Sequence, residues 1–156
     1  MLTLIRQQLS LTTKFDAISK EIELDITRTC TWHADFGSLD AKGSVLLKRV
    51  LLAYAFLDEE IGYRQGMNYL AALVLIRAEF DITMAFAIFE TLMRGERQWR
   101  KLYYDDCSTV CLVVKQVIDL LNPILHTHLQ GLPLTCLLAG PILGFFSHHV
   151  YDEMAC

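Results

Sequence analysis

The chain has 156 residues, of which 53% are hydrophobic and 21% charged, a balance that excludes a disordered tail and suits one domain. The net charge is −4 and no run of basic residues occurs, so nucleic acid is not an expected partner. The cysteine count is odd and no CxxC pair occurs, which indicates reduced thiols in a cytoplasmic protein; the cysteines are Cys30, Cys107, Cys111, Cys136 and Cys156.

The mean hydropathy of +0.33 raises the question of a membrane segment. The longest nearly uncharged stretch, residues 131–150, holds ~15 apolar residues between polar ends, whereas a spanning helix needs ~20. Pro133 and Pro141 also interrupt it. We therefore expect no transmembrane span and interpret this stretch as a core segment or a surface that meets a partner. Residues 1–25 lack the apolar run and the cleavage site of a secretory signal.

Hydrophobic residues recur every three or four positions over most of the chain, which is the spacing of amphipathic helices. The first such stretch predicts a helix over 14–25, on one face of which lie Phe15, Ile18 and Ile22. A polar, turn-forming loop at 27–43 follows it. The second stretch predicts a helix over 44–60, with Ser44 as its N-cap and a solvated acidic end at 58–60.

The second half of the chain continues the helical pattern, and no alternating strand pattern longer than a few residues occurs. The sequence therefore predicts an all-α protein. No linker-like tract divides the chain, so we expect a single domain over residues 1–156. The remaining helices are expected at 67–80, at 82–96 with Asp81 as N-cap, and at 109–129 with a kink at Pro123.

Common catalytic signatures are absent from the sequence, which has no GxSxG, HExxH or GxxxxGK[ST] motif. We therefore expect no nucleotide site within the chain itself. Two histidines, His126 and His128, are two positions apart and would point to different faces of a helix. Cys107 and Cys111 have suitable helical spacing but no companion ligands, so we expect no metal site.

Two segments are unusual against this background. Ile22, Asp25 and Arg28 are spaced I-x-x-D-x-x-R where the first helical pattern ends. The stretch "IGYRQGMNYLAA", residues 61–72, places polar residues between two glycines directly before a helix that is expected to be buried. Each segment has an ordinary interpretation when it is taken alone. The first would be an arginine at a helix end, and the second a glycine-bracketed turn.

In this order, I-x-x-D-x-x-R followed by Y-x-Q-G resembles the TBC domain, the family of GTPase-activating proteins for Rab-type small GTPases. The second motif is carried by Tyr63, Gln65 and Gly66, and the context continues to Asn68 and Leu70. The resemblance is strongest over residues 15–149 and lacks parts of the family pattern at both ends. The expected fold is an irregular multi-helix bundle like the N-terminal and central part of that domain.

The resemblance implies a regulator that completes the active site of another protein. Arg28 would be an arginine finger that stabilises charge on the transferred phosphoryl group, and Gln65 a glutamine finger that orients the attacking water. Tyr63 is expected to brace the second motif, and Asp25 to orient Arg28 through a charge-assisted hydrogen bond. The chain would need no cofactor, because GTP and magnesium belong to the partner GTPase. The supporting motif residues are Ile22, Asp25, Tyr63, Gly66 and Asn68.

The resemblance further implies a role in vesicle trafficking. The protein would be cytoplasmic and recruited to endomembranes, with any membrane association peripheral and mediated by the Rab-type partner. Two alternatives remain open at this point. The first alternative to a GTPase-activating protein is an inactive, truncated TBC-like binding module, and the second is a small membrane-associated helical protein held together by residues 131–150.

Overall fold

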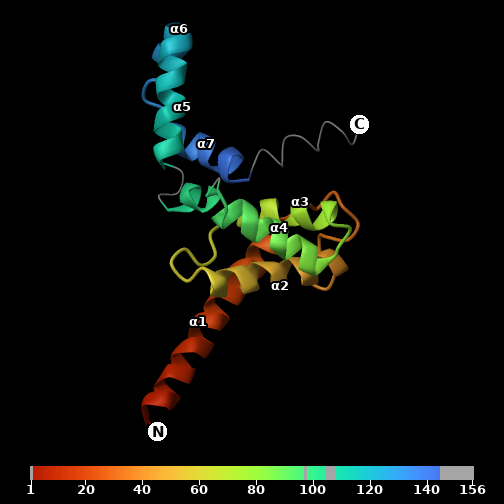
Figure 1. The fold of residues 1–156 in the computed structure, drawn as a ribbon. Coiled ribbons are helices and arrows are strands. Elements are labelled where there is room, and N and C mark those ends of the chain that lie inside the picture. Colours follow the sequence, from red (N-terminus) through yellow and green to blue (C-terminus); the bar gives the residue numbers. More distant parts are fainter. Residues whose placement is uncertain (1, 97, 105–107, 145–156) are drawn as a thin grey trace. The chain divides into compact units, whose positions relative to one another are not determined.

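The computed structural model describes residues 2–96, 98–104 and 108–144, and within these ranges all regular structure is helical (Figure 1). The prediction of an all-α fold is therefore confirmed. The described elements are α1 (Leu2–Ile26), α2 (Lys42–Leu57), α3 (Met67–Arg77), α4 (Ile82–Arg94), the 3-10 helix η1 (Trp99–Tyr103), α5 (Ser108–Leu121), α6 (Pro123–Leu129) and α7 (Leu134–Leu143).

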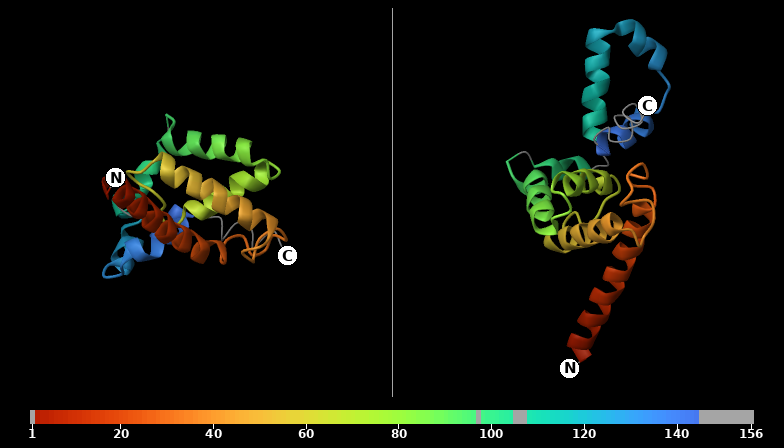
Figure 2. Two further views of the ribbon diagram at one scale, coloured as in Figure 1. Left: turned by 90° about the horizontal axis from the view of Figure 1, so that it is seen from below. Right: turned by 90° about the vertical axis from the view of Figure 1, so that its right-hand side faces the viewer.

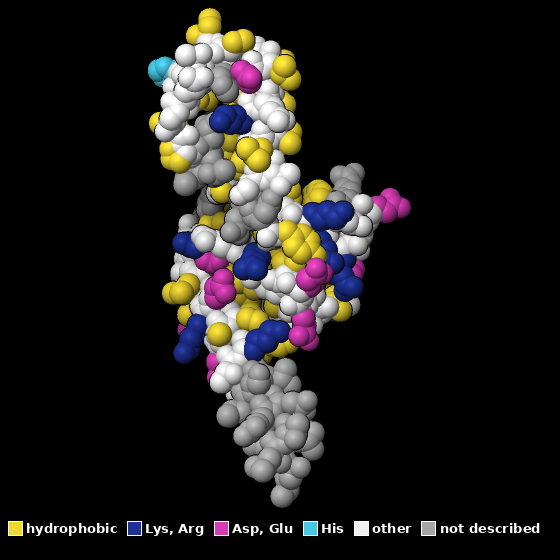
Figure 3. Space-filling model, turned by 90° about the vertical axis from the view of Figure 1, so that its left-hand side faces the viewer, with side chains coloured by type: hydrophobic (Ala, Val, Ile, Leu, Met, Phe, Trp, Pro, Cys, Tyr) yellow, Lys and Arg dark blue, Asp and Glu magenta, His cyan; other side chains and the backbone are white. Residues whose placement is uncertain are grey.

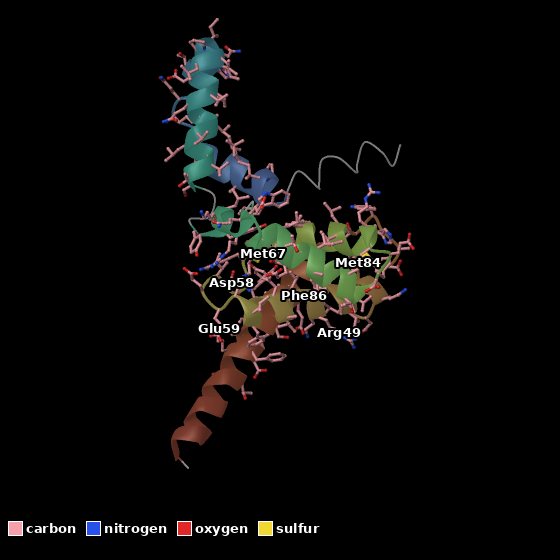
Figure 4. The ribbon with its side chains drawn as sticks, in the orientation of Figure 1. Arg49, Asp58, Glu59, Met67, Met84 and Phe86 are labelled. Atoms are coloured by element: carbon pink, nitrogen blue, oxygen red, sulfur yellow. The ribbon has the colours of Figure 1, made fainter. Side chains whose placement is uncertain are left out.

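The chain divides into two compact units, Met1–Phe89 and Glu90–Cys156. In the first unit α2 packs against both α1 and α3, as the views in Figure 2 show. The ring of Tyr54 on α2 meets that of Phe89 on α4 edge to face, with 5.1 Å between the ring centroids. Met67 at the start of α3 is fully buried, whereas Met84 on α4 is 53% exposed (both labelled in Figure 4). Each fully buried large apolar side chain contributes ~1.5–3 kcal/mol to stability.

The start of α2 differs from the sequence prediction. The helix begins at Lys42, and Ser44 lies inside its first turn, where the hydroxyl is buried without a hydrogen-bond partner. The cause is the preceding loop, which packs onto this turn: the Gly43 amide donates to the Asp35 carbonyl at 2.9 Å. A Cβ atom at Gly43 would lie 2.6 Å from that oxygen, so only glycine permits the approach. The N-cap prediction for Ser44 is wrong.

The acidic residues 58–60, which directly follow α2, were also expected to be solvated. This prediction is wrong for Asp58. Asp58 is 5% exposed and accepts a hydrogen bond from the hydroxyl of Tyr54 at 2.9 Å. Its carbonyl accepts from the Gly62 amide at 2.7 Å. The next residue, Glu59, is exposed and pairs with Lys14 at 3.1 Å, an exposed contact that adds little stability. Asp58 therefore secures the chain as it leaves α2 toward the glycine-bracketed segment.

In the second unit α5 packs against α6 and α7. The helix expected over 109–129 is two helices, because α5 ends at Leu121 and Asn122 caps α6 by accepting from the Leu125 amide at 3.0 Å. Pro123 occupies the first position of α6, where a backbone N–H would have no partner within the helix, so its absence costs nothing. Figure 3 shows mainly hydrophobic and uncharged side chains over α5 and α6. Of the helices in the described ranges, none is both long and apolar enough to cross a bilayer.

The N-cap predicted for α4 is confirmed and can be tested. Asp81 Oδ1 accepts from the amides of Thr83 at 2.9 Å and Met84 at 3.0 Å. Replacing Asp81 with alanine is expected to lower the free energy of unfolding by about 1 kcal/mol, as measured by urea denaturation. Asparagine at the same position keeps the oxygen acceptor and is expected to retain most of the stability. Equal stability of wild type and Asp81→Ala would show that the cap contributes nothing.

Candidate functional site

The two sequence motifs meet at the carboxylate of Asp25, in the last turn of α1. Asp25 is 4% exposed, and its Oδ1 accepts a hydrogen bond from the guanidinium of Arg28. Its Oδ2 accepts from the hydroxyl of Tyr63 at 2.5 Å, across 38 positions of sequence. The expected hydrogen bond between Asp25 and Arg28 is therefore present. The same carboxylate also joins the end of α1 to the segment before α3.

The end of α1 is held in place by burial and by a tight turn. Ile22 and Ile26 are almost fully buried and fix the last two turns against the core. Beyond the helix, the Arg28 amide donates to the Asp25 carbonyl at 3.2 Å, and the Thr29 amide to the Ile26 carbonyl at 3.0 Å. These turn contacts satisfy carbonyls that a helix end would otherwise leave without partners. Arg28 thus lies on a short turn whose two sides are anchored.

A second set of hydrogen bonds also connects the motifs. The Asn68 side chain is fully buried at the start of α3, and its Nδ2 donates to the hydroxyl oxygen of Thr29 at 2.8 Å. The Thr29 hydroxyl donates in turn to the Asp25 carbonyl at 2.6 Å. On its other side, Asn68 Oδ1 accepts from the Gly66 amide at 3.0 Å. Sequence reasoning missed Thr29, because a hydroxyl residue just after a helix is common and carries no distinctive spacing.

The two candidate fingers differ from their supports in exposure. The Arg28 side chain is 54% exposed, and Gln65 is also exposed. Gln65 lies in the turn that leads into α3, which continues with Gly66 in the left-handed conformation at φ 102°. A residue with a Cβ atom is strained there, which explains the glycine. The structure thus places both candidate fingers in contact with solvent, and both are attached directly to the hydrogen-bonded scaffold.

The other predicted site residues lie in the interior. Ile22, Asp25, Tyr63, Gly66 and Asn68 are all buried. Their contacts agree with a supporting role, but the roles of these five residues, and of Arg28 and Gln65 as catalytic groups, stay predictions.

The surroundings of Asp25 alter the acidity of neighbouring groups. Burial, followed by the hydrogen bond to Asp25, raises the pKa of the Tyr63 hydroxyl far above its usual value, so Tyr63 remains a neutral donor. Burial also raises the pKa of Glu21, and the nearby Asp25 carboxylate adds to this effect while Arg64 opposes it. Burial also raises the pKa of the Tyr69 hydroxyl, and the nearby Arg28 charge only partly opposes this rise. Arg28 therefore lies near one carboxyl group, that of Asp25, and two phenols, those of Tyr63 and Tyr69.

A metal site is not evident in this part of the chain. Among the residues that the structure describes, no three His, Cys, Asp or Glu side chains come together in a way that would hold a metal ion. Cys107 and the side chain of His126 lie outside the described residues, as do His148 and His149.

Comparison with known proteins gives a consistent result. The family model described as the Rab-GTPase-TBC domain matches residues 5–156. TBC1 domain family member 2A of Mus musculus is 37% identical over 119 residues, which cover 71% of this chain and 12% of that protein. The Ecotropic viral integration site 5 ortholog of Drosophila melanogaster is 31% identical over 145 residues, which cover 90% of this chain and 18% of that protein. The chain thus spans less than a fifth of these relatives, and no solved structure matches it significantly.

The bond between Tyr63 and Asp25 predicts a pH-dependent effect on stability. Tyr63→Phe is expected to lower the free energy of unfolding at neutral pH by about 1–3 kcal/mol, because a buried carboxylate loses a donor. The raised pKa of Tyr63 in the folded state means that its contribution is complete below pH ~10, the ordinary tyrosine pKa, and is lost as the pH rises above it. The stability gap between wild type and variant should therefore narrow above pH ~10 in urea titrations. A gap that is constant with pH would contradict this assignment.

Proposed function

We propose, since this chain belongs to the Rab-GTPase-TBC domain family, that it accelerates GTP hydrolysis by a Rab-type small GTPase. In this proposal the protein supplies side chains to the partner's active site and is not itself an enzyme. GTP and magnesium are bound by the partner, and the chain brings no cofactor. The observation that supports the proposal best is the Asp25 carboxylate, which joins the two motifs that carry the candidate fingers.

The chemistry of phosphoryl transfer explains what Arg28 would contribute. Negative charge on the transferred group must be stabilised, and there is little covalent work for protein groups. A guanidinium presents five N–H donors in a rigid fork, and the bond to Asp25 leaves donors free to reach outward. Asp25 is buried and therefore fixed in place, and its bond to Arg28 orients the guanidinium before a partner arrives. The Arg28 side chain is nevertheless 54% exposed, so a partner can reach it.

Gln65 would orient the water that attacks the terminal phosphate. A carboxamide accepts a hydrogen bond from water through its oxygen and donates through its nitrogen, so it serves this role without changing charge. The turn that presents Gln65 is held by the bond from the Gly66 amide to Asn68. The exposed Arg64, which precedes Gln65, would lie at the rim of the contact with the GTPase.

Cellular placement follows from the partner. Rab-type GTPases act in vesicle trafficking, so the protein would be a cytoplasmic regulator recruited to endomembranes by its partner. Recruitment would need no lipid-inserted segment of its own.

Substitution of the two fingers tests this function. Single-turnover GTP hydrolysis would be measured with purified GTP-loaded Rab-type GTPases, with and without the full chain. Arg28→Lys and Gln65→Ala should each remove most of the acceleration, since an arginine finger contributes ~10³–10⁵ in rate and lysine lacks its planar fork.

Two matched variants serve as controls for these measurements. Arg49→Lys on α2 (Figure 4) and Gln130→Ala after α6 replace exposed residues of the same types outside both motifs and should act like wild type. Acceleration that is unchanged in both finger variants would remove Arg28 and Gln65 from the mechanism. GTPase binding without acceleration by the wild type would instead support the alternative of an inactive binding module.

A further inference from the structure

The residues that directly follow the two candidate fingers are joined through one buried amide. Thr29 follows Arg28, and Gly66 follows Gln65. Asn68 donates to the Thr29 hydroxyl oxygen at 2.8 Å and accepts from the Gly66 amide at 3.0 Å. This route between the two turns does not use the Asp25 carboxylate or Tyr63.

The direction of each hydrogen bond in this route is determined by chemistry. The Gly66 amide can only donate, so the oxygen of Asn68 must face it. The Asp25 carbonyl can only accept, so it takes the single proton of the Thr29 hydroxyl, 2.6 Å away. The hydroxyl oxygen is then an acceptor for the Asn68 nitrogen. This arrangement satisfies the Gly66 amide, the Asn68 side chain, the Thr29 hydroxyl and the Asp25 carbonyl together. A flipped Asn68 would instead place its NH2 group against the Gly66 N–H, so that two donors would face each other.

Burial makes this arrangement costly to break. Thr29 and Asn68 are both 0% exposed, so water does not replace a lost partner without rearrangement. The Gly66 amide belongs to the peptide that joins Gln65 to Gly66, and its orientation therefore sets the backbone from which the Gln65 side chain leaves. The Thr29 hydroxyl similarly ties the residue after Arg28 to the last turn of α1.

We propose that Thr29 and Asn68 are positioning residues that hold the backbones of Arg28 and Gln65 in one fixed relation, so that both side chains enter a GTPase active site together. This inference rests on the proposed function. Neither residue reaches solvent, so neither contacts the GTPase. Their effect is on the maximal rate and not on the affinity between the two proteins.

The test compares Thr29→Val with Thr29→Ser in the full chain. Valine keeps the shape of threonine but removes the hydroxyl, whereas serine keeps the hydroxyl and loses only a methyl group. Thr29→Val should lower the maximal GTP hydrolysis rate at saturating protein by about 10-fold or more, with the half-saturating concentration nearly unchanged. Thr29→Ser should stay within about twofold of wild type in both quantities.

A second measurement reads the turn directly, without a GTPase. Hydrogen exchange at the Gly66 amide should be faster in Thr29→Val than in Thr29→Ser by about 10-fold, because an Asn68 without its hydroxyl partner holds the amide less firmly. Should Thr29→Val fail to fold, the double variant Thr29→Val/Asn68→Leu replaces both members of the Thr29–Asn68 bond by apolar groups, and of the donors in this route only the Gly66 amide then lacks its side-chain acceptor. It should melt cooperatively and still show the reduced maximal rate.

The possible outcomes separate this inference from the proposed function. Equal maximal rates, or equal Gly66 exchange, in Thr29→Val and Thr29→Ser would overturn the inference even if the wild type is fully active. A loss of affinity with an unchanged maximal rate would also overturn it. A wild type that accelerates no GTPase would overturn the proposed function instead. The exchange comparison alone would then decide whether Thr29 and Asn68 hold the turn.

Discussion

The first unit depends on a single buried carboxylate. Asp25 is almost inaccessible to solvent, and a buried carboxylate is stable only if donors surround it. Arg28 supplies one donor from the next turn, and Tyr63 supplies another from a segment 38 positions away. The carboxylate therefore has both donors only when the segment before α3 is packed against α1. Stability and the geometry of the candidate site thus rest on the same contact.

Much of the fold was predictable because it depends on local pattern. The spacing of apolar residues predicted α2, α3 and α4, and Asp81 caps α4 as its position suggested. The errors fall where the fold adds a contact that the spacing of apolar residues does not specify. Ser44 is not a cap, because a loop closes onto α2 through Gly43, and Asp58 is buried because Tyr54 supplies a donor. The Gly43 contact depends on the path of the loop, and the Asp58 contact depends on which way the Tyr54 side chain points.

The candidate site shows the same division. Spacing and family resemblance identified Asp25, Arg28 and Tyr63, and the hydrogen bonds among them are present. No spacing rule identified Thr29, whose importance arises only when α3 brings Asn68 against it. Hydroxyl residues at helix ends usually bond to their own backbone, and Thr29 does so as well. Its second bond is a product of tertiary packing, which single-sequence patterns do not encode.

The contrast between buried supports and exposed tips has a physical consequence for any partner that docks here. A flexible arginine or glutamine would lose rotational freedom on binding, at ~0.5–1.5 kcal/mol for each immobilised side chain. In this protein part of that loss occurs on folding, because Arg28 is already bonded to Asp25 and the turn of Gln65 is already held through Gly66. Because these bonds form on folding, the free energy of folding offsets part of an entropy cost that would otherwise oppose docking. This explains why a small helical unit would bury so many polar groups beneath two exposed side chains.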